Sequence, residues 1–334
     1  MATHSEPDSR RRQVLINAVS AAVMAPSSHN TQPWRFRISG GALELHADPR
    51  RHLTVIDPDR RQLVQSCGCA LFNAEVAVRA MGYVPQVTVL PDPADPDLLA
   101  VLRPGEPRPP TDEDRALMRA LPLRRTNRRR FQARPVGADE VAALAATAER
   151  PGVWLVRLDP EGKRRVAQVI DLADRIQYGD QAFRAELARW LVAAGSRRDD
   201  GIPFVEKEYG SSIPFAVMRA LRSPDLGADF GRLEEELVRG APAVLVMGTD
   251  GDDARAWLAA GQALEALLLQ ATARGLSAAF LNQALEIGEL RDGVRAVIGH
   301  AGHPQMILRL GYPAEPIHHP SPRRDLDDVL RILD

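Results

Sequence analysis

The chain has little of what would place it in several large classes of protein. Only two of its 334 residues are cysteines, Cys67 and Cys69, which are too few for a disulfide framework or a thiolate metal site. Lys plus Arg total 43 and Asp plus Glu total 44, so no general field favours nucleic acid or an anionic membrane surface. We interpret the two cysteines as packed small residues, and their scarcity predicts a reducing cytoplasm.

Several site signatures are also absent from the sequence. No segment approaches the ~18 unbroken apolar residues of a membrane span. There is no Gly-x-Gly-x-x-Gly dinucleotide fingerprint and no Gly-x-Ser-x-Gly elbow. The histidines, among them His29 and His303, do not fall at the spacing of a metal-ligand set. We therefore expect no metal centre, no membrane partner and no nucleic-acid partner.

The N-terminus carries a weak export pattern. Arginines at 10–12 precede a rather apolar stretch at 14–25, which is similar to a twin-arginine signal. Asn17 and Ser20 interrupt the apolar run, and its apolar residues fall at helical spacing. We interpret the stretch as an amphipathic helix that leads into the following turn.

What the chain does contain is typical of a folded protein with an internal repeat. Hydrophobic residues make up 45% of it and charged residues 26%, as in soluble globular proteins. A Gly-x-Ala-Leu sequence begins at Gly68 and again at Gly261, and each begins an apolar helical pattern. A second glycine follows each at the same interval, at Gly82 and Gly275, where it suits a helix C-cap. The small residues would let these helices approach each other closely.

Strand patterns repeat in the same way. A β-type run follows each helix, at 86–90 and at 278–281, and Trp34 with its apolar neighbours resembles the segment around Trp154. We therefore favour an internal duplication over a chance match.

The second half is longer than the first, and the excess falls at about 160–240. That stretch predicts helices at 163–176 and 181–194 with a loop at 197–203. An insertion of this size beside a ligand site often acts as a lid or a substrate wall.

Four prolines between residues 102 and 112 predict an extended linker outside either core. The expected organisation is a first half at 1–120 and a second half at 121–334.

The turn at residues 26–33 indicates a ligand. Ser27, Ser28 and Asn30 follow Pro26, and Pro33 leads into the apolar strand that begins at Trp34. Such a turn can present neutral donors and acceptors to a flat heterocycle, for example the pyrimidine edge of a flavin. The alternative is an ordinary polar loop that caps a helix.

A second candidate is a basic cluster with five arginines within residues 124–130. It could be a solvated basic face or a nucleic-acid patch, but it has no interleaved aromatic residues. Planar guanidinium groups bind a phosphate dianion through charge-assisted bidentate bonds.

Both segments resemble motifs of one family. The run Pro-Ser-Ser-x-Asn-x-Gln-Pro-Trp at 26–34 closely resembles the flavin-binding turn of the nitroreductase superfamily. The segment ending at Phe131 resembles that family's second motif, Arg-Arg-Ser/His-Ser-x-Arg/Lys-x-Phe. This resemblance places four residues at flavin-contacting positions: Arg125, Thr126, Asn127 and Arg129. Asn127 stands where a serine is commoner, which leaves its specific role open.

The order of the motifs is the reverse of the family's, in which two subunits form each site. Residues 149–152, Glu-Arg-Pro-Gly, stand where a second turn would precede Trp154. The sequence thus resembles the Acg-type branch of the superfamily. This resemblance implies an α+β fold duplicated as a pseudo-dimer, with mixed or antiparallel sheets flanked by helices. It also implies one flavin mononucleotide (FMN) site between the halves, in a monomer that could pair further.

Two more segments gain roles from the resemblance. The run at 280–284, with Leu281, Asn282 and Gln283, stands where the family runs backbone past the flavin ring; otherwise it is a strand end. Gly311-Tyr312-Pro313 resembles the family's ending, and the arginines after it, Arg323 and Arg324, could complete phosphate binding or be an exposed pair.

The implied activity is that of an FMN-dependent oxidoreductase. NAD(P)H or another donor would reduce the flavin, which would then reduce a small organic acceptor in ping-pong fashion. The sequence singles out no catalytic acid or base. Two alternatives are a flavin storage or sequestration protein covered by its insertion, and a flavin oxidase or dehydrogenase for one natural product. For the latter the candidate wall residues are Phe204, Tyr209 and Phe215.

Overall fold

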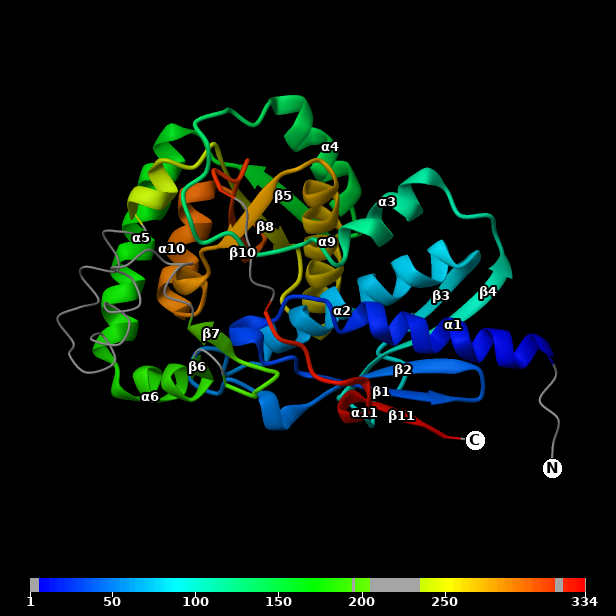
Figure 1. Ribbon diagram of the computed structural model, residues 1–334. Helices are drawn as coiled ribbons and strands as arrows, with labels where there is room; N and C mark the ends of the chain where they lie inside the picture. The colour runs from blue at the N-terminus through cyan, green and yellow to red at the C-terminus, as the bar shows by residue number, and fades with distance from the viewer. Residues whose placement is uncertain (1–5, 194–195, 205–234, 316–320, 334) are drawn as a thin grey trace.

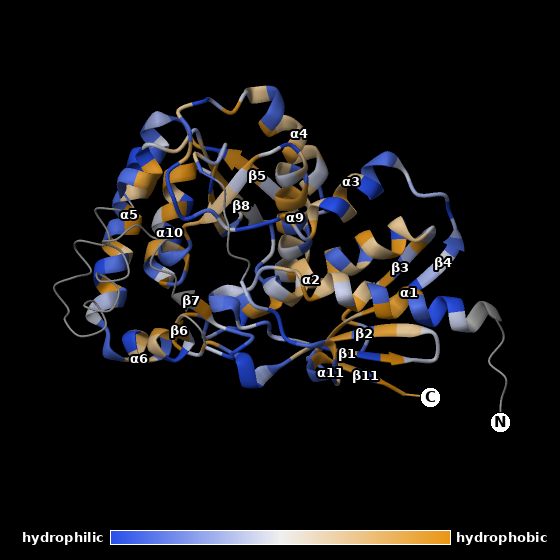
Figure 2. Cartoon of the chain, viewed as in Figure 1, coloured by the Kyte–Doolittle hydropathy of each residue, from blue (hydrophilic) through white to orange (hydrophobic). Residues whose placement is uncertain are grey.

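The computed structural model describes residues 6–193, 196–204, 235–315 and 321–333. They form an α+β fold with two separate antiparallel-rich sheets and a pair of long helices between them (Figure 1). Apolar residues concentrate on the strands and on the inward faces of these helices, whereas the outer loops and helix faces are hydrophilic (Figure 2).

The first sheet has five strands in the order β11-β1-β2-β4-β3. Along β1, Trp34, Phe36 and Ile38 are buried while Arg35 and Arg37 are exposed, so one face of the sheet packs on the core. The strands are β1 (Trp34–Ser39), β2 (Ala42–Ala47), β3 (Tyr83–Val89), β4 (Leu98–Pro107) and β11 (Leu330–Ile332).

The second sheet has four strands in the order β5-β8-β10-β9. Every residue of β8 is buried because helices cover both faces of this sheet. Leu245 and Met247 pack into the core shared with the first half, whereas Val244 and Val246 pack under the outer helices. The strands are β5 (Val153–Arg157), β8 (Ala243–Thr249), β9 (Ser277–Phe280) and β10 (His303–Gly311).

The two sheets repeat one topology. Apart from β11, both are antiparallel throughout, and strand order in the first (β1-β2-β4-β3) parallels that in the second (β5-β8-β10-β9). A helix joins the second strand to the third in each: α2 (Arg61–Ala80) and α9 (Ala254–Ala273). The segments paired by sequence thus occupy equivalent places, β1 with β5 and β3 with β9. The repeated topology supports an internal duplication.

Helices α2 and α9 cross at the two repeated glycines. A Cβ atom at Gly68 would lie 2.3 Å from the Leu258 carbonyl oxygen, and one at Gly261 would lie 2.0 Å from that of Gln65. The Cys69 thiol donates to the Gly261 carbonyl (3.2 Å). The expected close approach through small residues is confirmed, and both cysteines are free and buried.

The remaining elements enclose these layers. Helix α1 buries Leu15, Ala18 and Ala22 against α2, as expected of an amphipathic helix. Among the described residues, no helix is long and apolar enough to cross a membrane. These elements are α1 (Glu6–Ala22), α3 (Asp112–Ala120), α4 (Ala138–Ala148), α5 (Pro160–Gly179), α6 (Gln181–Trp190), α10 (Gly288–Ile298), α11 (Leu326–Val329), β6 (Leu191–Ala193) and β7 (Ile202–Phe204).

Two expectations from the sequence are wrong. The linker predicted at 102–112 begins inside β4, where Leu102 is 1% exposed, and Pro104 is tolerated because it pairs with Pro85 at a shift in register. The helix predicted through residue 194 ends at Trp190, and β6 pairs with β7 instead. Tyr209 and Phe215 lie outside the described residues, as does the side chain of Phe204.

The C-terminal segment returns from the second half to the first. Strand β11 pairs in parallel with β1, with Leu330 opposite Phe36, and so extends the first sheet (Figure 1). The segment that leads to it, at 321–325, runs past the end of α1, where the candidate turn lies. The tail therefore joins the two halves beside the candidate turn.

Candidate functional site

The turn that begins at Pro26 has a strained backbone. His29, Asn30 and Gln32 all have φ near +50°, the left-handed region that non-glycine residues rarely adopt. The Ser27 hydroxyl accepts from the backbone N–H of Gln32 (2.9 Å) and helps to hold this shape. Such strain persists only where the surroundings enforce it, and it concentrates at functional sites.

Side chains of the turn reach three other parts of the molecule. The Ser28 hydroxyl donates to Gln62 Oε1 on α2 (2.5 Å). The Asn30 amide donates to two carbonyl oxygens, that of Gly201 in the insertion (3.0 Å) and that of Pro322 in the tail (3.1 Å). The turn therefore joins the first half, the insertion and the C-terminus.

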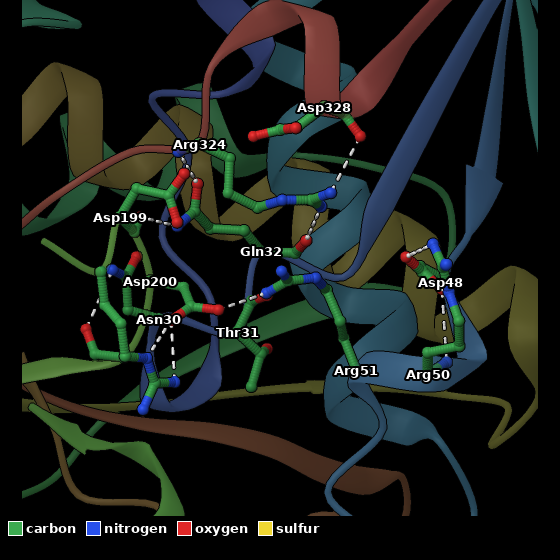
Figure 3. A network of polar contacts seen from close by, with 12 residues as sticks. Asn30, Thr31, Gln32, Asp48, Arg50, Arg51, Asp199, Asp200, Arg324 and Asp328 are labelled. Atoms are coloured by element: carbon green, nitrogen blue, oxygen red, sulfur yellow. Dashed lines mark hydrogen bonds and ion pairs between the residues drawn. The ribbon is translucent and has the colours of Figure 1, made fainter.

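A polar network reinforces this junction (Figure 3). The Gln32 amide donates to the Asp199 carbonyl (2.8 Å), and Gln32 Oε1 accepts from the backbone N–H of Arg324 (2.9 Å). Arg51 forms an ion pair with Asp200 (2.9 Å). Arg324 itself is 8% exposed, and its guanidinium donates to the Gln32 carbonyl. The alternative of an exposed arginine pair is excluded for Arg324.

The basic motif lies against the end of the second sheet. Thr126 forms a parallel bridge with Ala278 of β9, and the Asn127 N–H donates to the Ala278 carbonyl (2.8 Å). The Asn127 side chain accepts from the Arg129 N–H (3.0 Å), and buried Arg309 donates to the Asn127 and Arg129 carbonyls. The motif and the segment after β9, which the sequence places in one site, are therefore neighbours.

The segment after β9 and the turn each hold an unsatisfied buried atom. Leu281 is fully buried, and Asn282 Oδ1 accepts from the Ile307 N–H (3.1 Å). Gln283 Oε1 and His29 Nδ1 are buried without a hydrogen-bond partner among the described residues. Burial lowers the pKa of His29 to about 4, so its ring is neutral at pH 7. Both atoms could be satisfied by a ligand with donors and acceptors.

Several arginine side chains lie close to the start of the turn. The Arg323 guanidinium donates to the Met24 and Ala25 carbonyls at the start of the turn (3.1 and 3.2 Å). Burial, together with the charges of Arg124 and Arg125, lowers the pKa of Arg323 to about 9. Three guanidinium groups, from the tail and the basic motif, therefore act on one another behind the turn.

The other arginines of the motif face outward to different degrees. Arg129 is half-buried and forms an ion pair with Glu315, whereas Arg130 is 74% exposed and pairs with Glu236 (2.9 Å). Arg125 is half-buried and donates to the carbonyl of the preceding residue (2.8 Å). Among the predicted phosphate ligands, the charge of Arg125 lowers the pKa of Arg323.

A set of polar residues beside the turn was not predicted from the sequence. Gln62, which accepts from Ser28, donates to Glu286 Oε1 (2.9 Å), and Gln177 of α5 donates to Glu286 Oε2 (2.6 Å). Burial raises the pKa of Glu286. Its position two residues beyond the predicted segment at 280–284 was the available signal.

Comparison with known proteins indicates one family. The "Nitroreductase family" model matches residues 123–312, beginning at the basic motif and leaving the turn at 26–34 outside. The chain is 37% identical over 336 residues to "Putative NAD(P)H nitroreductase Rv3131" of Mycobacterium tuberculosis, covering 99% of this chain and 93% of that one. It is 30% identical to "Putative NAD(P)H nitroreductase acg" of the same organism, covering 96% of each.

A solved structure is similar over part of the chain. The FMN-dependent nitroreductase NfnB from Mycobacterium smegmatis, in complex with NADPH, is 22% identical with a TM-score of 0.45. The alignment covers 67% of this chain and all of that one. On the family match and the full-length relatives together, the chain belongs to the nitroreductase family.

Proposed function

We propose that this protein is an FMN-dependent oxidoreductase that uses NAD(P)H to reduce a small organic acceptor. The observation that carries the proposal is the meeting of four segments at one junction between the halves. They are the strained turn, the basic motif, the run after β9 and the arginine-bearing tail. The names of the two mycobacterial relatives support NAD(P)H as the donor.

The residues present suit this cofactor. Ser27, Ser28 and Asn30 would hold the ring from the first half, where the neutral His29 offers an unsatisfied nitrogen. From the second half, Thr126, Asn127 and the run Leu281–Gln283 would line the ring and ribityl chain. Arg125 and Arg129 would bind the phosphate, with Arg323 and Arg324 fixing the wall behind it.

A bound flavin would supply the hydride-transfer chemistry between the donor and the acceptor. The chain's own part is to orient the flavin and to set its electrostatic surroundings. The arginines would favour the anionic phosphate, and the neutral side chains of the turn would suit the uncharged heterocycle. The repeated topology supports one such site in a pseudo-dimeric monomer, with halves at 1–120 and 121–334.

The test is an anaerobic NAD(P)H titration of the FMN-loaded, desalted protein, followed by visible absorbance. We expect retained flavin bands that bleach as the donor is added. Retained bands that persist with both NADH and NADPH would contradict the proposed activity. That outcome would favour a sequestered flavin, with the site closed to donors by the insertion contacts at Asp199 and Gly201. The absence of retained flavin would contradict the cofactor assignment.

A further inference from the structure

A buried carboxyl group behind the turn has no role in the function proposed so far. Glu265 lies on α9 and is 0% exposed. Arg124 Nε is 3.7 Å from Glu265 Oε1, beyond hydrogen-bonding distance, and neither carboxylate oxygen accepts a well-formed bond from the described residues. An ionised carboxylate is rarely left so incompletely satisfied in a protein interior.

The groups that face Glu265 come from three segments. Arg124 belongs to the basic motif, Arg323 to the tail and Asn73 to α2, and all three favour its charged form. Cys69 of α2 is also within reach of its charge, but burial raises the pKa of that thiol well above its usual value, so it stays neutral. Burial nevertheless dominates and raises the pKa of Glu265 to about 7.

The two arginines that face Glu265 also belong to the charge cluster behind the turn. Arg323 is influenced by Arg124 and Arg125 as well as by Glu265. Among the described residues, the cluster therefore holds three guanidinium groups and one carboxyl group. The Nε atoms of Arg124 and Arg323 are, like the carboxylate oxygens, buried without a hydrogen-bond partner among the described residues.

We propose that Glu265 is the internal counter-charge of the phosphate site, and that it takes up one proton when the FMN phosphate binds. This inference rests on the proposed function, since it requires that phosphate to bind at the arginine cluster. In the free protein the ionised carboxylate partly balances the cluster. A bound phosphate dianion neutralises the arginines in place of Glu265, and its negative charge disfavours the ionised form of the Glu265 carboxyl.

The direction of the pH dependence follows from this exchange. Binding of a dianion raises the pKa of Glu265 above its free value of about 7. Between the free and bound values the complex holds one more proton than the free protein. FMN affinity should therefore fall as the pH rises above 7, by at most about tenfold per pH unit for one proton. Well below pH 7 the carboxyl is protonated before the phosphate binds, and this dependence disappears.

The experiment is calorimetry of FMN binding at pH 8 in two buffers with different protonation enthalpies, repeated with riboflavin. We expect uptake approaching one proton with FMN and none with riboflavin, which lacks the phosphate. In Glu265→Gln the uptake should fall close to zero, and the affinity should change little between pH 7 and pH 8, below the pKa of Arg323 of about 9. In the control Glu75→Gln both should match the wild type, because Glu75 is a largely buried carboxyl that accepts from Gln262 (2.6 Å) and pairs with Arg79 (3.4 Å) instead.

The failures can be told apart. FMN binding without proton uptake, or equal uptake with riboflavin, would overturn the role of Glu265 and leave the proposed function standing; these comparisons need only the wild-type protein. Uptake that persists in Glu265→Gln would assign the proton to another group. A wild-type chain that does not bind FMN would overturn the proposed function and this inference with it.

Discussion

At the scale of single residues, the sequence indicates the turn as a candidate site but does not indicate the hydrogen-bond partners of its side chains. Ser28 and Asn30 belong to a motif of nine consecutive residues, which can be recognised from the local sequence alone. Their partners lie on α2, in the insertion and in the tail, and nothing in the local sequence indicates contacts over such separations. Glu265 left a weak signal, because it is a charged residue directly between Ala-Leu pairs in the middle of α9.

Replacement of Arg125 by alanine tests the phosphate contact. We expect FMN affinity to fall roughly 10- to 100-fold, because a hydrogen bond to a charged group contributes about 1.5–3 kcal/mol. Riboflavin affinity should change little. Both can be measured by quenching of flavin fluorescence.

Arg130→Ala is the matched control for this substitution. Arg130 belongs to the same motif but is 74% exposed and pairs with Glu236, so its loss should have little effect on either ligand. Equal losses of FMN affinity in both variants would point to general electrostatics instead of a specific phosphate ligand.

At the scale of elements, the sequence predicted what depends on short-range patterns. The Gly-x-Ala-Leu repeat identified α2 and α9, although each helix begins seven residues before its glycine, at Arg61 and Ala254. The apolar residues after Pro33 identified β1. The four prolines suggested a linker where β4 lies. Proline lacks a backbone N–H donor, but the local sequence does not show whether the neighbouring strand needs a hydrogen bond at that position. Strand β11 is three residues long, too short to be recognised without the sheet it joins.

The helix crossing provides a test at this scale. Gly261→Ala should lower the free energy of unfolding by about 1–3 kcal/mol, because the new methyl group would meet the Gln65 backbone at 2.0 Å. Gly293→Ala lies within α10 with no atom within 4 Å of the added Cβ, so it should stabilise the protein by up to ~1 kcal/mol. Denaturant unfolding measures both changes, and an unchanged midpoint for Gly261→Ala would argue against this crossing.

At the scale of the whole molecule, the tail holds the two halves together at the site. It adds β11 to the first sheet, and it places Arg323 and Arg324 against the turn. These two roles occupy consecutive parts of the tail and can therefore be separated by deletion.

A chain that ends at Val329 would lose β11 but keep both arginines. We expect it to unfold at a lower denaturant concentration and to bind FMN with nearly wild-type affinity. A chain that ends at residue 320 should also lose FMN binding, because the bonds from Arg323 and Arg324 to the turn are removed. Full FMN affinity in the shorter chain would show that the tail does not support the site.

The central claim is that one flavin site lies between the halves and is built from both. The most direct measurement is the stoichiometry of FMN binding to the wild-type chain, to the Ser28→Ala, Asn30→Ala double variant and to Arg125→Ala. The account predicts one FMN per chain, with affinity weakened by the changes in either half. Two FMN per chain, or binding that does not respond to the changes in the first half, would contradict it.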